Sequence, residues 1–229
     1  MRNAPMMLTV GNGLLGLVAL WLILDGHLLL AMFAIMLGAI LDLMDGWAAR
    51  RFGVASSNGA TADTISDLIS FGIAPAVLIA TVGHGILRWT AAGVYFLGIV
   101  FRLLRFRLRT PEAKEFQGMP SPMAALAITS LVVLSVKWFP QYPIAEIGAP
   151  VYALLAVSLI PFPKFGHPAM KMVSRTMLLI IWLVHFVAFL FYPPEALWSF
   201  TIFYLIIGPS IMLRHRRMAA MSASVEVQG

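Results

Sequence analysis

The sequence contains no cysteine, and only 11% of its 229 residues are charged. Without cysteine, the chain can form neither a disulfide framework nor a thiolate metal site. A soluble domain of this length would need roughly twice this charged fraction to cover its surface. Hydrophobic residues instead make up 60% of the chain, and the mean hydropathy is +0.89. These values exclude an ordinary soluble domain and indicate a multi-pass membrane protein.

Long apolar runs define the expected fold class. A helix crosses a bilayer with about 20 apolar residues, so the sequence predicts an all-α integral membrane protein with about eight transmembrane helices. The expected spans are residues 6–24, 28–49, 60–82, 89–108, 122–139, 147–160, 173–191 and 196–213. The sixth is short and could be tilted or partly interfacial. The first resembles a signal peptide, but no convincing cleavage site follows it, so we expect a retained helix.

Basic residues indicate how the chain is oriented. On this topology, every Lys and Arg except Arg88 and Lys137 lies on one side of the membrane. The positive-inside rule makes that side cytoplasmic, so we expect a cytoplasmic-membrane protein with both termini inside. A net charge of +6 could also suggest nucleic acid. Loop positions favour anionic lipid instead, and no nucleic-acid partner is expected. The basic tail, residues 214–229, is expected to be disordered.

Four of the ten acidic residues lie within one short window that has apolar flanks. Charge at membrane depth is costly and marks a functional site. Residues three or four apart share a helix face, and a short connection makes the second and third spans antiparallel. Two carboxylate pairs should therefore meet near the cytoplasmic ends of these spans. The window reads Asp42-x-x-Asp45-Gly46-x-x-Ala49-Arg50, eight residues, then Gly59-x-x-x-Asp63-x-x-x-Asp67.

A divalent metal would resolve the repulsion among these carboxylates. The window contains neither His nor Cys, so oxygen ligation favours Mg²⁺, Mn²⁺ or Ca²⁺ over Zn²⁺. Gly46, Ala49 and Gly59 leave the same face open to a bulky ligand, although small residues also serve helix packing in membranes. Each Asp alone could instead cap a helix or pair with Arg50 or Arg51. The alignment of all four favours a site for one or two metal ions.

The complete window resembles the signature of the CDP-alcohol phosphotransferases, also called CDP-alcohol phosphatidyltransferases, with the eight-residue spacer intact. This resemblance implies a six-helix catalytic core, placed at residues 1–172, and usually a homodimer. Residues 173–213 would add two further helices. The implied reaction in phospholipid synthesis transfers a phosphatidyl or archaetidyl group from CDP-diacylglycerol or CDP-archaeol to an alcohol and releases CMP.

The resemblance also assigns roles to matched positions. The metal ligands, for two ions as is usual in this family, would be Asp42, Asp45, Asp63 and Asp67. Asp67 would also be the catalytic base that takes the proton from the attacking hydroxyl. The CDP-binding residues would be Asn12, Asp42, Gly46, Ala49, Arg50, Gly59 and Asp63. Two metals about 4 Å apart can neutralise a pyrophosphate and the departing CMP, which agrees with the acidic pattern.

Further stretches resemble one branch of this family, the phosphatidylserine synthases. They are Thr9-x-x-Asn12 with Gly16, and residues 68–76, 102–106, 116–122 and 158–164. Four residues in them would contact the acceptor or a lipid phosphate: Arg102, Arg105, Gln117 and Ser121. The two arginines share a helix face, and arginine forks bind phosphate and carboxylate well. The two arginines could also be ordinary basic residues at the cytoplasmic end of a span. Residues 118–122 could be only a rigid turn that leads into the next span.

Two departures from that branch leave the acceptor open. Residues 62–67 read Ala-Asp-Thr-Ile-Ser-Asp instead of Leu-Asp-Ser-x-Ala-Asp, and Arg107 replaces an expected Asn. Serine is the expected acceptor, whereas an extra cation would suit glycerol phosphate or inositol phosphate. A different class, a cation transporter, would place the carboxylates on a conduction path. The intact spacer and the lack of broken helices in paired halves argue against a transporter.

Overall fold

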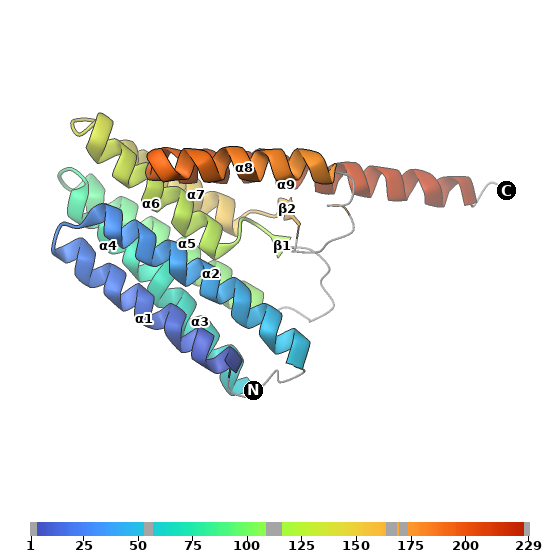
Figure 1. Ribbon diagram of the computed structural model, residues 1–229, viewed down its shortest axis with the longest axis horizontal. Helices are drawn as coiled ribbons and strands as arrows, with labels where there is room; N and C mark the ends of the chain where they lie inside the picture. The colour runs from blue at the N-terminus through green and yellow to red at the C-terminus, as the bar shows by residue number, and fades with distance from the viewer. Residues whose placement is uncertain (1–3, 53–56, 109–115, 164–168, 170–173, 227–229) are drawn as a thin grey trace.

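The computed structural model describes residues 4–52, 57–108, 116–163, 169 and 174–226. This part of the chain is almost entirely helical (Figure 1). A two-stranded antiparallel sheet joins β1 (Phe116–Gln117) to β2 (Pro161–Phe162). The helices are α1 (Ala4–Leu24), α2 (Leu28–Phe52), α3 (Ser57–Asp67), the π-helix η1 (Leu68–Ile73), α4 (Ala74–Val82), α5 (Leu87–Arg107), α6 (Ser121–Trp138), α7 (Ile144–Val157), α8 (Arg175–Phe191) and α9 (Pro193–Glu226).

Hydropathy and helix length confirm the predicted class. Within the described residues, six helices are long and apolar enough to cross a membrane: Pro5–Leu24, Leu28–Ala48, Gly59–Val82, Leu87–Arg107, Ser121–Trp138 and Pro193–Met218. Ile144–Val157 and Thr176–Phe191 are shorter apolar helices. The third span consists of α3, η1 and α4 in succession. The chain is therefore an all-α, multi-pass membrane protein, as expected.

The C-terminal segment differs from the prediction. We expected disorder beyond residue 213, but α9 continues to Glu226 and extends beyond the remainder of the molecule (Figure 1). This segment contains several Arg, Ala and Met residues, which are strong helix formers. Because an established membrane helix needs no new nucleation step, such residues can prolong it.

Close packing of α1 places its polar residues against the third span. A Cβ atom at Gly16 would lie 2.8 Å from Cα of Ser70, so only glycine permits this approach. Ser70 Oγ then donates a hydrogen bond to the carbonyl oxygen of Asn12 at 2.8 Å. A Cβ atom at Gly13 would likewise lie 2.9 Å from Oγ of Ser66. Glycine on α1 therefore determines which side chains of α1 face α3.

The second half of the molecule is built on α5, α6 and α7. α7 packs against both α5 and α6, and α9 packs against α6 and β2. The turn at Gly118 has a φ of +80°, and a Cβ atom there would lie 2.9 Å from the carbonyl carbon of Ala156. This glycine lets the loop after β1 pass directly over the end of α7.

Candidate active site

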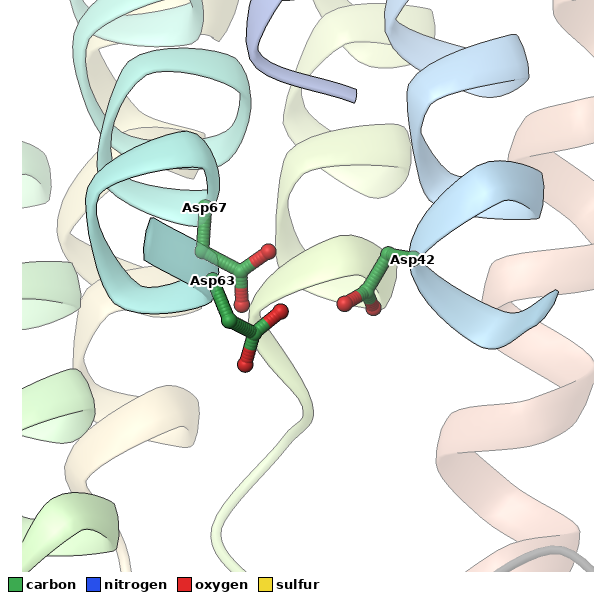
Figure 2. Close-up of side chains that lie close together, drawn as sticks. All are labelled: Asp42, Asp63 and Asp67. Atoms are coloured by element: carbon green, nitrogen blue, oxygen red, sulfur yellow. The ribbon is translucent and has the colours of Figure 1, made fainter. Parts of the chain in front are cut away.

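Three aspartates converge between α2 and α3. One carboxylate oxygen from each of Asp42, Asp63 and Asp67 lies within 4.8 Å of the others. Figure 2 shows these side chains pointing toward one another, with Asp42 on one helix and the other two on the facing helix. Asp63 and Asp67 are four residues apart, so they occupy the same face of α3. The structure thus brings together three of the four predicted metal ligands.

Asp45 belongs to the same region but not to this group. It is buried, and its Oδ2 atom accepts a hydrogen bond of 2.8 Å from Oγ1 of Thr9 on α1. Its charge lies close enough to interact with Asp42 and Asp63. Its role as a metal ligand stays a prediction. Sequence reasoning noted Thr9 but gave it no contact with Asp45.

Asp67 is held by a residue from the first helix. Nδ2 of Asn12 donates a hydrogen bond of 3.1 Å to Oδ1 of Asp67, and both side chains are buried. The structure shows this amide orienting a carboxylate. The expected contact of Asn12 with CDP stays a prediction. A Cβ atom at Gly38 would lie 3.0 Å from Oδ1 of Asn12, so α2 leaves room for this amide.

The donor set fits a hard divalent cation. Oδ1 of Asp63 is buried and has no hydrogen-bond donor among the described residues. A buried acceptor without a partner is costly, and adjacent carboxylates repel one another. A cation among Asp42, Asp63 and Asp67 would relieve both penalties. Carboxylate oxygens are the ligands that Mg²⁺, Mn²⁺ and Ca²⁺ prefer, so the cluster can bind such a metal.

A π-helix begins directly after Asp67, which sequence reasoning did not predict. Within η1, the N–H of Ala74 bonds to the carbonyl of Ile69, five residues earlier. Pro75 has no N–H to donate to the carbonyl of Phe71, four residues before it. The hydroxyl of Tyr95 supplies that donor instead, at 3.0 Å. In the sequence, Pro75 within an apolar span was the feature that could have indicated an irregular helix here. Single π-helical turns are frequent at functional sites.

Arg102 places a buried cation beside the acidic cluster. Its Nε atom donates to the carbonyl oxygen of Met119 at 2.8 Å, and Nη1 donates to Oγ of Ser121 at 2.6 Å. Its charge interacts with those of Asp67 and Asp42. Arg102 and Ser121, both predicted to bind the acceptor alcohol or a lipid phosphate, therefore contact each other close to the candidate metal ligands.

Arg105 has a different environment from Arg102. Its guanidinium donates to the carbonyl oxygens of Val157 at 2.7 Å, Ser158 at 3.1 Å and Gln117 at 2.8 Å. Carbonyls at a helix end lack intrahelical donors, so Arg105 caps α7 and joins it to β1. A contact from Arg105 or from the half-buried Gln117 to the acceptor stays a prediction.

The remaining predicted CDP contacts lie along the same two helices. Gly46 on α2 and Gly59 on α3 are half-buried. The side chains of Ala49 and Arg50 lie outside the described part of the structure, which gives only their helical backbone. Sequence reasoning also missed a contact of Arg107, whose Nη2 atom donates to Oγ1 of Thr61 at 2.8 Å. This bond ties the end of α5 to α3, two residues before Asp63.

Comparison with known proteins agrees with this geometry. Residues 2–162 match the family model for CDP-alcohol phosphatidyltransferase. The chain is 34% identical over 172 residues to the CDP-diacylglycerol–serine O-phosphatidyltransferase of Bacillus subtilis, covering 74% of this chain and 94% of that protein. It is 32% identical over 168 residues to the archaetidylserine synthase of Methanothermobacter thermautotrophicus, covering 72% and 69%. A Mycobacterium leprae relative, also named CDP-diacylglycerol–serine O-phosphatidyltransferase, is 26% identical and covers 94% of this chain and 76% of its own length.

The matched region contains Asp42, Asp63 and Asp67, together with Asn12, which bonds Asp67, and Arg102, whose charge lies near Asp67 and Asp42. The resemblance inferred from the acidic window is therefore confirmed: the chain belongs to the CDP-alcohol phosphatidyltransferase family.

Proposed function

We propose that this protein transfers a phosphatidyl or archaetidyl group from CDP-diacylglycerol or CDP-archaeol to the hydroxyl of serine and releases CMP. The observation that carries this proposal is the convergence of Asp42, Asp63 and Asp67 within 4.8 Å in a member of this family. Serine is favoured because the relatives at 32–34% identity are named for serine transfer or archaetidylserine synthesis.

The aspartates would hold the metal against the pyrophosphate of the donor. Asp42, Asp63 and Asp67, with Asp45 as a fourth candidate, would bind one or two ions of Mg²⁺ or Mn²⁺, with Ca²⁺ as an alternative. Bound metal would neutralise the charge on the pyrophosphate and on the departing CMP. The hydrogen bond from Thr9 to Asp45 and that from Asn12 to Asp67 would keep the carboxylates in place while substrate enters.

Asp67 is the proposed general base. An alcohol is a weak nucleophile, so a positioned carboxylate must accept its proton as the new bond forms. The serine oxygen forms a bond to the phosphorus of the donor, and the bond from phosphorus to the CMP oxygen breaks. The proton passes to Asp67, and CMP leaves with the electron pair. Because Asn12 occupies Oδ1 of Asp67, the proton would go to Oδ2.

Arg102 and Ser121 would recognise an anionic group of the substrates. The buried guanidinium lies near Asp67, and its Nε and Nη1 atoms are held by Met119 and Ser121. A fixed guanidinium binds a phosphate or a carboxylate with little loss of conformational freedom. We assign to Arg102 the lipid phosphate or the serine carboxylate. Arg105 and Gln117 would support this contact from the next turn of α5 and from β1.

The family and the charge pattern also support a location. The acidic cluster and Arg107 lie at the same end of the helical bundle. On the proposed topology, most of the basic residues also lie at this end. We place this end, both termini and the active site on the cytoplasmic side of the cell membrane. The working form is proposed to be a homodimer within the bilayer.

Release of CMP by the purified protein in detergent tests this function. CDP-diacylglycerol and CDP-archaeol are each supplied with serine, glycerol phosphate or inositol phosphate, in the presence of Mg²⁺, Mn²⁺, Ca²⁺ or a chelator. We expect metal-dependent CMP release with serine. Release with a phosphorylated polyol and none with serine would refute the acceptor assignment. Cation flux in liposomes, with no CMP released from the donor in the presence of any of these alcohols, would support a transporter instead.

A phosphorylated polyol remains the second candidate acceptor because of Arg107. This arginine is exposed at the end of α5 and reaches α3 at Thr61, near Asp63. A cation there adds charge that a phosphorylated alcohol would use and that serine does not need.

A further inference from the structure

The last helix packs against the strand β2, although it lies beyond the region that matches the family model. The ring of Tyr204 on α9 stacks on that of Phe162, with centroids 5.5 Å apart and planes inclined by 22°. Four residues later, a Cβ atom at Gly208 would lie 3.3 Å from Cδ of Pro163 and 3.4 Å from Cδ1 of Phe162. In Figure 1, α9 passes beside β2. This contact is therefore close and involves a fully buried ring, Phe162.

β2 in turn holds the loop that carries the acceptors of Arg102. Phe162 pairs with Phe116 and Pro161 with Gln117. Past the end of β1, the N–H of Gly118 bonds to the carbonyl of Ile160 at 2.9 Å, and that of Met119 to Leu155 at 2.9 Å. Met119 is completely buried. These bonds fix the carbonyl of Met119 and the start of α6 at Ser121.

Arg102 depends on this loop for its orientation. Both of its recorded acceptors, the carbonyl of Met119 and Oγ of Ser121, lie within four residues of β1. The phenol of Tyr204 and the guanidinium of Arg102 are also close enough to interact electrostatically. A path of direct contacts therefore leads from α9 through Phe162 and the sheet to the cation beside Asp67.

We propose that α9 completes the active site and that Tyr204 is a positioning residue, which holds Arg102 against the acidic cluster through Phe162 and the β1–β2 sheet. This inference rests on the proposed function for its activity readout. It gives a role to a helix that the signature motif does not include. Tyr204 itself need not touch either substrate.

Substitution of Tyr204 tests the stacking contact. Tyr204→Leu removes the ring, and we expect kcat/KM to fall about tenfold or more, the scale typical of lost support for a functional group. Tyr204→Phe keeps the ring and should retain activity within about threefold of wild type. Ile206→Ala, at a position on α9 that is 61% exposed, is the matched control and should change nothing. Equal activities of Tyr204→Leu and Ile206→Ala would overturn the proposal, as would a Tyr204→Phe variant as weak as Tyr204→Leu.

A double-mutant cycle separates positioning of Arg102 from general support of the fold. Arg102→Lys alone should lower activity and change the KM of the substrate that Arg102 binds. If Tyr204 acts through Arg102, Tyr204→Leu should change the same KM and add little in the Arg102→Lys background. Independent, multiplicative losses would refute the proposal. Should Arg102→Lys have no measurable turnover, Ser121→Ala, which removes one of its acceptors, takes its place in the cycle.

A milder pair of variants covers the case in which Tyr204→Leu does not fold. Gly208→Ala adds a single methyl group 3.3 Å from Cδ of Pro163 and 3.4 Å from Cδ1 of Phe162, a tight contact to which β2 must adjust. Gly93→Ala adds the same group on α5, where the described residues leave open space within 4 Å. We expect Gly208→Ala to lower kcat/KM and Gly93→Ala to leave it unchanged. Equal activities would contradict the role of α9.

Failure of this inference can be told apart from failure of the proposed function. Each ratio of variant to wild type is measured with whichever alcohol the wild-type protein uses. Activity with a phosphorylated polyol alone would therefore refute serine as acceptor and leave the α9 test intact. If no alcohol supports turnover, the cycle of Tyr204 and Arg102 is read by the apparent Tm in detergent. Additive shifts in Tm would then overturn the coupling.

Discussion

Asn12 on α1 donates a hydrogen bond of 3.1 Å to Asp67 on α3, across 55 positions of the sequence. The first helix is therefore part of the site and not only a membrane anchor. Its approach requires Gly16 against Ser70, and the hydroxyl of Ser70 in turn binds the backbone of Asn12. The position of the Asp67 carboxylate on α3 therefore depends on glycine at position 16 of α1.

Asn12→Asp should abolish the hydrogen bond from position 12 to Asp67. The change replaces a donor with an acceptor and brings a further negative charge against Asp67. We expect turnover to fall by about 10–100-fold, as for other residues that orient a metal ligand. CMP release by the purified variant measures this. Gln141→Glu, an equivalent change in an exposed loop, is the control. Wild-type turnover in Asn12→Asp would show that the bond to Asp67 has no function.

Asp67→Asn and Asp63→Asn should separate the base from the metal site. An amide at position 67 cannot accept the proton, so turnover should drop by about 100-fold or more. Mn²⁺ binding, followed by electron paramagnetic resonance, should survive in part. Asp63→Asn should weaken Mn²⁺ binding more strongly, because its buried oxygen has no other partner among the described residues. Asp25→Asn, in an exposed turn, is the control. Near-normal turnover of Asp67→Asn would remove this residue as the base.

Thr9→Val tests whether Asp45 ligates metal. The substitution keeps the shape of the side chain but removes the hydroxyl that binds Oδ2 of Asp45. If Asp45 is a ligand, metal affinity should fall by about tenfold, and Asp45→Asn should lower it further. Titration of activity against Mg²⁺ or Mn²⁺ measures both effects. Unchanged affinity in both variants would confine the site to Asp42, Asp63 and Asp67.

Tyr95→Phe should destabilise the π-helix that follows Asp67. Its hydroxyl is the recorded donor to the carbonyl of Phe71, which Pro75 cannot serve. Loss of this hydrogen bond to the buried Phe71 costs about 0.5–1.5 kcal/mol, so the apparent Tm should fall. Pro75→Ala restores an N–H and should recover part of that loss in the double variant. A double variant no more stable than Tyr95→Phe would refute this account of the π-turn.

Arg107→Asn tests the acceptor preference. This change removes the cation that distinguishes the chain from the serine branch and breaks the bond to Thr61. We expect turnover with serine to be retained and any activity with glycerol phosphate or inositol phosphate to fall by about tenfold. Thr61→Val, which breaks the same bond but keeps the cation, is the control. A loss of serine turnover in Arg107→Asn alone would assign Arg107 to the serine pocket.

Local patterns in the sequence determined the membrane class, the spans and the acidic window. Each is a local property of the chain, either a run of about 20 apolar residues or an i, i+4 spacing of carboxylates, so no long-range contact is needed to recognise it. The sequence analysis did not predict the helical extension to Glu226. The basic residues after position 213 suggested a disordered tail, whereas the helix propensity of the same residues favours a helix.

Only the tertiary structure decided how the side chains meet. Asp45 accepts a hydrogen bond from Thr9 and does not belong to the group formed by the other three aspartates. The spacing in the sequence had placed Asp45 on the same face of its helix as Asp42. Arg102 and Arg105 share a face of α5, yet one lies beside the acidic cluster and the other caps α7. Pro75 on α4 cannot donate to the carbonyl of Phe71, and Tyr95 on α5 donates to it instead. Such outcomes depend on which helices become neighbours, and that is determined by packing between distant segments.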